Sequence, residues 1–180
     1  MRLQALVARP RGRHTLVHCA SQADAPTSIP APVVVELVVM GAHGGAGTTT
    51  LARLLGPSWD MGSITRRQPD RAPFVTRGRP LVLACRNTPA AARAATAAIA
   101  ALRHGGQEVA VLVVVGDGGP EPRDATARFA LLADRTGGLV RMPFVTSLRL
   151  VDDPVSVRLP AKAQAALAAV HDLTRGQLRP

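Results

Sequence analysis

Residues 41 to 50 read Gly-Ala-His-Gly-Gly-Ala-Gly-Thr-Thr-Thr and combine two residue types that a phosphate-binding loop requires. Glycine allows positive φ and a close approach of the backbone, so that successive N–H groups can point at one anion. A threonine hydroxyl that follows such a loop can bind Mg²⁺. The segment therefore predicts a nucleotide- or anion-binding site, with Thr49 as the candidate magnesium ligand. Its candidate residues are His43, Gly44, Gly45, Ala46, Gly47, Thr48, Thr49 and Thr50.

Two further candidates follow apolar runs elsewhere in the chain. Arg86 follows the run 80–85, and Asp117 follows the run 109–115. Ligands of parallel sheets gather at the carboxyl ends of the strands, so Arg86 could hold an anion and Asp117 could accept a hydrogen bond from a base or ribose. Structural interpretations remain open as well. The glycine segment could be a plain turn, Arg86 a cap of the sheet edge, and Asp117 part of a turn before a proline.

The pattern of apolar residues predicts the elements that position these candidates. Buried strands are predicted at four runs: 33–40, 80–85, 109–115 and 139–142. Helices are predicted at four segments: 48–55, 88–104, 121–135 and 161–173. Residues 57 to 79 show no periodicity and are predicted to form a long loop. Strands that alternate with helices indicate an α/β fold with right-handed crossovers and a mostly parallel sheet.

Composition divides the chain into three parts. Residues 1–32, rich in Arg, Pro, Ser and Thr, are predicted to be a flexible arm, and residues 176–180 a tail. Residues 33–175 are predicted to form a single α/β domain, because 180 residues with 47% hydrophobic content suffice for one core. No signal peptide or membrane-spanning segment is recognised, so we expect a cytoplasmic protein.

The net charge of +10 comes almost entirely from arginine, with Lys162 as the single lysine. Most arginines are scattered, as on a solvated surface, and two short clusters could contact nucleic acid or a protein partner. The scarcity of aromatic residues argues against recognition of single strands by base stacking. The clusters are Arg9, Arg11 and Arg13 in the arm, and Arg66, Arg67 and Arg71 in the long loop.

Residues 43–50 resemble the K-G-G-x-G-K-T-T signature of ParA/MinD-type P-loop ATPases, and segments 82–89 and 111–117 resemble strands of that family that end near the nucleotide. A closer resemblance is to small actinobacterial proteins with a G-x-H-G-G-A-G loop and an R-x-P-[FW]-V segment, here residues 141–145. Those proteins occur around conjugative and integrative elements, and their activity is unassigned. The resemblance implies a three-layer P-loop NTPase-like fold, truncated relative to active relatives, with a sheet of about four to five strands. It also implies ATP or another nucleotide with Mg²⁺ as the ligand, and a protein partner, with a homodimer as one arrangement.

The chain lacks the residues of that signature that contribute most to phosphoryl transfer. Thr48 replaces the lysine that reaches the β- and γ-phosphates, His43 replaces the signature lysine, and Ala42 stands where the outer glycine should be. Asp60 and Asp70 follow no apolar run, so no Walker B acid is recognised. Each lost electrostatic contact of this kind costs on the order of 3 to 4 kcal/mol of transition-state stabilisation. We therefore expect weak nucleotide binding or none, and no efficient hydrolysis.

The sequence supports three function hypotheses. The leading one is a catalytically degenerate P-loop-like protein that acts as a regulatory or scaffold partner in mobile-element or DNA-partitioning machinery. The second is an active ATPase of the ParA/MinD type that takes its lysine from elsewhere. The third is a non-specific DNA-binding module that uses the arginine clusters, whose binding would fall steeply with added salt.

Overall fold

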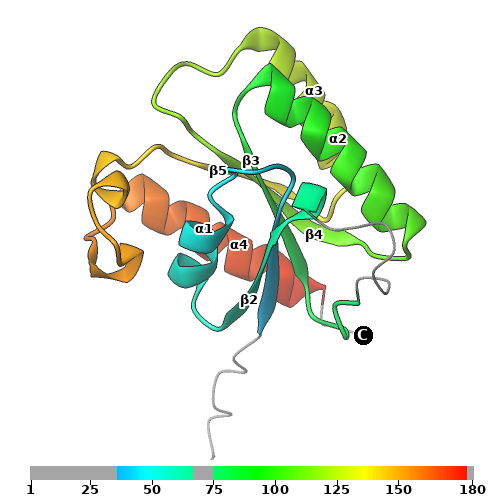
Figure 1. Cartoon of the computed structure of the whole chain (residues 1–180), viewed down its shortest axis with the longest axis horizontal. Coiled ribbons are helices and arrows are strands. Elements are labelled where there is room, and N and C mark those ends of the chain that lie inside the picture. The colour runs from blue at the N-terminus through cyan, green and yellow to red at the C-terminus, as the bar shows by residue number, and fades with distance from the viewer. Residues whose placement is uncertain (1–35, 67–74, 178–180) are drawn as a thin grey trace, which may run out of the picture. The chain divides into compact units, whose positions relative to one another are not determined.

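The computed structural model describes residues 36–66 and 75–177, which build one five-stranded sheet in the order β2-β1-β3-β4-β5 (Figure 1). All four pairs of neighbouring strands are parallel. This confirms the α/β class and the parallel sheet. The strands are β1 (Leu37–Gly41), β2 (Ser58–Ser63), β3 (Leu81–Arg86), β4 (Val109–Val115) and β5 (Leu139–Met142).

The three inner strands lie where continuous apolar runs predict them. Residues of β1, β3 and β4 are almost all buried, because helices cover both faces of the sheet. Such strands are apolar throughout and do not alternate apolar with polar residues. The first strand begins at Leu37 in the described residues, whereas the prediction began at residue 33, which lies outside them. The predicted arm 1–32 and cluster members Arg67 and Arg71 also lie outside the described residues.

The prediction of a long loop over residues 57–79 was wrong for its first part. Strand β2 pairs with β1 in parallel, with Leu37 opposite Ser58 and Val39 opposite Asp60, and a 3₁₀ turn η1 (Ile64–Arg66) follows it. As an edge strand, β2 has one neighbour, and most of its side chains are exposed or half-buried. Backbone hydrogen bonds to β1 can order such a strand without the apolar run that a buried strand needs.

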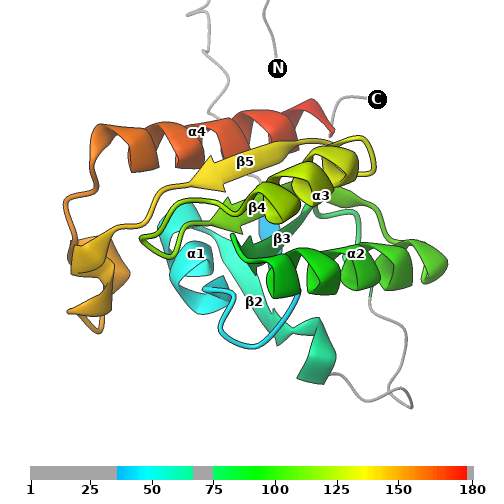
Figure 2. The same ribbon diagram turned by 90° about the horizontal axis from the view of Figure 1, so that it is seen from above.

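Four helices of the described chain cover the two faces of the sheet. Helices α2 and α3 lie side by side on one face, and α1 and α4 contribute to the core on the other (Figures 1 and 2). Helix α2 begins at the predicted cap, since Thr88 Oγ1 accepts a hydrogen bond from the N–H of Ala91 at 3.2 Å. None of the described helices is long and apolar enough to span a membrane. The helices are α1 (Thr48–Leu55), α2 (Pro89–His104), α3 (Arg123–Ala133) and α4 (Ala161–Gly176).

Residues 143–160 form an excursion that links β5 to α4 and carries two 3₁₀ turns, η2 (Thr146–Arg149) and η3 (Pro154–Ser156). The turn η3 packs against α1, and Arg53 of α1 lies 3.3 Å from the carboxylate of Asp153. The excursion therefore brings residues near position 150 next to the first helix of the sheet, about 100 positions earlier in the chain.

Candidate functional site

The glycine loop (residues 41–50) joins the carboxyl end of β1 to the first turn of α1. Gly45 and Gly47 have φ of 79° and 85°, a conformation that glycine adopts without steric cost. A Cβ atom at Gly44, Gly45 or Gly47 would meet nothing within 4 Å, so the outer surface of the loop is open. Within the described chain, no backbone N–H from His43 to Thr50 donates a hydrogen bond. The loop therefore contains successive N–H groups that have no partner in the described chain, at the N-terminus of a helix.

The side chain of Thr48 lies inside the loop rather than on its open surface. The residue is 8% exposed, and a Cβ atom added to Gly41 would collide with Thr48 Oγ1. Ala42 and Ala46 are buried beside it. The residue that replaces the lysine of the P-loop signature thus fills the underside of the turn and provides no positive charge at its mouth.

His43 ties the loop to the end of β3. Its Nε2 atom accepts a hydrogen bond from the N–H of Arg86 at 3.2 Å, and its Nδ1 atom lies 2.8 Å from the carbonyl oxygen of Gly44. A neutral imidazole with the proton on Nδ1 satisfies both contacts. The structure therefore brings two predicted site residues, His43 and Arg86, into direct contact.

Thr49 is paired with an acidic residue of β2. Its hydroxyl donates a 2.6 Å hydrogen bond to Asp60 Oδ2, and Asp60 Oδ1 accepts from the N–H of Gly62 at 2.9 Å. A hydroxyl beside a carboxylate is an oxygen donor set of the kind that Mg²⁺ accepts when a phosphate completes it. Asp60 was not predicted as a site residue, because no apolar run precedes it. The only usable signal was its place as the first acidic residue after the helix.

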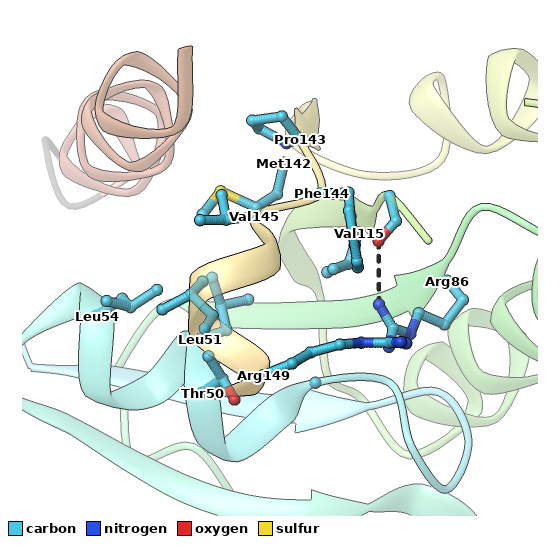
Figure 3. A pocket seen from close by; sticks show the side chains of 13 residues that line it. Thr50, Leu51, Leu54, Arg86, Val115, Met142, Pro143, Phe144, Val145 and Arg149 are labelled. Carbon is cyan, nitrogen blue, oxygen red and sulfur yellow. Dashed lines mark hydrogen bonds between the residues drawn. The ribbon is translucent and has the colours of Figure 1, made fainter. Parts of the chain in front are cut away.

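A cavity of about 100 Å³ opens next to the loop, between α1, the carboxyl ends of β3, β4 and β5, and η2 (Figure 3). Gly47 and Thr50 form its boundary on the loop side, and most of the remaining wall is apolar. Arg86 and Arg149 also line it, and Figure 3 shows the Arg149 side chain directed toward that of Arg86. No sequence pattern predicted Arg149 as a site residue, because its position beside the cavity depends on how residues 143–160 fold.

Each of the two arginines is held by a neighbour. Arg86 Nη1 donates to the carbonyl oxygen of Gly116 at 3.0 Å, and the Arg149 guanidinium lies 5.1 Å from the centre of the Phe144 ring. In the described part of the chain, neither forms a salt bridge with a carboxylate. The cavity therefore carries positive charge without an internal counterion.

Asp117 and Lys162 do not line this cavity. Asp117 is exposed, and its Oδ1 atom accepts from the N–H of Gly119 at 3.1 Å, as in a local turn. Lys162 lines a separate hollow of about 400 Å³ together with Asn87 and Glu121. The single lysine of the chain is therefore not placed over the glycine loop.

Glu121 lines that second hollow, and Cys85 lies in the core. Glu121 accepts two hydrogen bonds of 3.0 Å from Arg141, and this contact lowers the pKa of the carboxyl group below its usual value. Burial, with a smaller contribution from the charge of Glu121, raises the pKa of the Cys85 thiol to about 12. Cys85 is thus protonated at neutral pH and is a core residue rather than a nucleophile. The side-chain oxygen of Asn87 is buried and has no partner in the described part of the chain.

Comparison with protein-family models, with curated proteins and with solved structures finds no match to this chain. In the described ranges, no three His, Cys, Asp or Glu side chains gather as they would around a metal ion held by protein ligands alone.

Proposed function

We propose that the protein binds a phosphate-bearing small molecule of the nucleotide class at the glycine loop, weakly and without efficient hydrolysis, and acts as a regulatory or scaffold partner. The observation that carries this proposal is the row of available N–H groups from His43 to Thr50, which lies beside the hydroxyl of Thr49 and next to the cavity lined by Arg86. Backbone donors at a helix N-terminus bind anions through aligned dipoles and need no lysine to do so.

The cavity beside the loop has both apolar and cationic lining residues. Small-molecule sites are mostly apolar clefts with a few polar groups that fix orientation. Here Leu51 and Val115 contribute apolar wall, while Gly47 and Thr50 connect the cavity to the loop. At about 100 Å³ the cavity is smaller than most small-molecule sites, so it can enclose a phosphate group of the ligand while the remainder of a nucleotide lies outside it.

Thr49 and Asp60 are the residues that would hold Mg²⁺ in such a complex, because their oxygen atoms fit the preference of that ion. When bound, Mg²⁺ neutralises phosphate charge. The side chain of Thr48 faces inward and cannot replace the ammonium group that stabilises a transferring phosphoryl group. The absence of that ammonium group supports nucleotide binding rather than nucleotide hydrolysis.

The biological setting is part of the proposal and rests on resemblance alone. The loop 43–50 and the segment 141–145 resemble proteins of mobile elements, which supports a role beside mobile-element or DNA-partitioning machinery. An active ATPase with a displaced cation is a second candidate, and the specific observation in its favour is the pair of arginines in the cavity, Arg86 and Arg149.

The test is a thermal-shift series with ATP, ADP and GTP, each with and without Mg²⁺, on the full chain. A ligand at about ten times its Kd contributes about 1.4 kcal/mol to the folded state. For a chain of this size, that raises Tm by roughly 3 to 6 °C.

Thr49→Val should reduce the part of the shift that depends on Mg²⁺. Thr96→Val is the matched control, because Thr96 lies on α2 and its hydroxyl donates to Ala92 O at 2.9 Å.

A parallel turnover assay separates the two nucleotide hypotheses. Binding with no phosphate release supports the degenerate protein, whereas clear basal turnover supports the active ATPase. Absence of any shift at millimolar nucleotide would refute the binding site itself. DNA retention on filters that falls steeply with salt, and ignores ATP, would favour the DNA-binding alternative.

A further inference from the structure

Arg86 and Arg149 meet in one cavity although they are far apart in the sequence. Arg86 is the last residue of β3, and Arg149 is the last residue of η2 in the excursion 143–160. Figure 3 shows both side chains reaching into the same space beside α1. Arg86 is half-buried and Arg149 is exposed, and neither has a carboxylate partner in the described chain. Two cationic side chains that border one hollow favour an anion between or beside them. The arrangement therefore points to a negatively charged occupant.

No carboxylate of the described chain lines the cavity, so an internal salt-bridge network does not account for the two arginines. Asp153, in the same excursion as Arg149, lies 3.3 Å from Arg53 instead. Glu121, at the carboxyl end of the sheet, accepts hydrogen bonds from Nε and Nη2 of Arg141. These acidic groups have cationic partners of their own, so Arg86 and Arg149 are not members of a charge pair in the described chain.

The position of Arg149 is fixed by packing. Val145 is buried and Leu148 is half-buried in the core beneath α1, on either side of the first residues of η2. The N–H of Leu148 donates to Val145 O at 3.2 Å, which closes the turn. The ring of Phe144 lies beneath the guanidinium at 5.1 Å and limits its orientation. The packing of η2 thus fixes the backbone at Arg149, and Phe144 orients its exposed side chain.

We propose that Arg149, together with Arg86, supplies the positive charge that Thr48 lacks and binds a phosphoryl group of the ligand on the glycine loop. This inference rests on the proposed function, because it concerns the same ligand. Gly47 and Thr50 line the same cavity as the two arginines, so the end of the loop and both guanidinium groups border one space. A guanidinium presents a planar fork of N–H groups that matches phosphate oxygens.

The positive charge comes from a different part of the chain than it does in the P-loop signature. A lysine at position 48 would lie on the loop itself, whereas Arg149 arrives from a segment about 100 residues later that also contacts α1 through η3. Ligand binding then links the excursion 143–160 to the loop 41–50. A partner that contacts the excursion could sense the bound ligand through this link.

The experiment measures the affinity of inorganic pyrophosphate, without metal, by titration calorimetry on the full chain. The variants are Arg149→Gln, Arg149→Lys and the matched control Arg158→Gln. Arg158 is exposed in the same connection, does not line the cavity and forms no salt bridge in the described residues.

Removing a charged hydrogen-bond donor to a phosphate should weaken binding roughly ten- to hundredfold. Arg149→Lys should lose less, because it keeps the charge but not the fork. Equal Tm values without ligand confirm that the variants fold.

The outcomes separate this inference from the proposed function. Loss of affinity in Arg149→Gln with retention in Arg158→Gln supports the arginine pair. If wild type and Arg149→Gln bind equally well, the loop binds phosphate and the role of Arg149 is refuted. If both glutamine variants lose the same affinity, general surface charge explains binding and the inference again fails. If wild type does not bind at all, while ATP also produces no thermal shift, the proposed function fails and this inference fails with it.

Discussion

The hydroxyl of Thr49 donates a 2.6 Å hydrogen bond to the carboxylate of Asp60 and so joins the first turn of α1 to the edge strand β2. The glycine loop is consequently held from two sides, because His43 also ties it to the end of β3. In the described chain, the backbone N–H groups of residues 43–50 donate no hydrogen bond.

Replacing the carboxylate in this pair should affect binding that depends on metal. Asp60→Asn keeps the shape of the side chain but removes its charge, so we expect nucleotide affinity to fall in the presence of Mg²⁺ by roughly tenfold and to change little without it. Calorimetric titration of ATP with and without Mg²⁺ measures the difference. Asp134→Asn, a substitution at the end of α3, is the control. An equal loss with and without Mg²⁺ would show that Asp60 only shapes the loop.

The sequence was sufficient to predict the parts of the fold that are dominated by burial. Strands β1, β3 and β4 are covered on both faces, so their apolar runs could be recognised without knowledge of the sheet order. The start of α2 was equally clear, because Thr88 and Pro89 suit the cap and the first helical position. In these segments, local preference and tertiary packing favour the same structure.

The residues that were missed depend on tertiary contacts. Asp60 lies on an edge strand whose order comes from pairing with β1, and pairing leaves no apolar pattern in the sequence. Arg149 becomes part of the site only because the excursion 143–160 packs against α1. Thr48 could be recognised as a missing lysine, but its inward direction could not, since that depends on the space beside Gly41.

Gly41 should be intolerant of any side chain for a steric reason. A Cβ atom there would collide with Thr48 Oγ1 and lie 3.1 Å from the carbonyl oxygen of His43. We expect Gly41→Ala to lower the free energy of unfolding by about 1 to 3 kcal/mol, as other overpacking substitutions do. Urea denaturation gives this value.

The double variant with Thr48→Ala tests the cause. Removal of Oγ1 relieves the closest contact, so Gly41→Ala should cost less in the Thr48→Ala background than in wild type. An unchanged cost in both backgrounds would mean that the backbone of His43, rather than Thr48, limits the space.

The cap of α2 should contribute measurably to stability. Thr88 Oγ1 satisfies the N–H of Ala91, which has no partner within the helix. Thr88→Ala is expected to lower the free energy of unfolding by about 1 kcal/mol, while Thr88→Ser, which keeps the hydroxyl, should lower it much less. Chemical denaturation of the three proteins is the measurement. If the serine variant is as unstable as the alanine variant, packing of the threonine methyl group is the dominant contribution.

The ion pair between Glu121 and Arg141 should make stability depend on acid pH. Hydrogen bonds from Arg141 lower the pKa of Glu121 in the folded protein from its ordinary value of 4.5. A carboxyl group with a lowered folded pKa stabilises the protein above its unfolded pKa, and this stabilisation is lost as the pH falls through the folded pKa. The free energy of unfolding of wild type should therefore exceed that of Glu121→Gln near neutral pH and lose this advantage below about pH 4.5.

The expected difference is small, because the Arg141 side chain is 50% exposed and solvent screens the pair. Exposed pairs contribute up to about 1 kcal/mol. Urea denaturation between about pH 3 and pH 7 measures the difference, with the cycle completed by Arg141→Gln and the double variant. In the Arg141→Gln background, Glu121→Gln should show a weaker pH dependence, since the main cause of the lowered pKa is gone. A wild-type advantage that persists unchanged at the acid end of this range would show that the side chain of Glu121 stabilises the carboxyl end of the sheet by packing rather than by its charge.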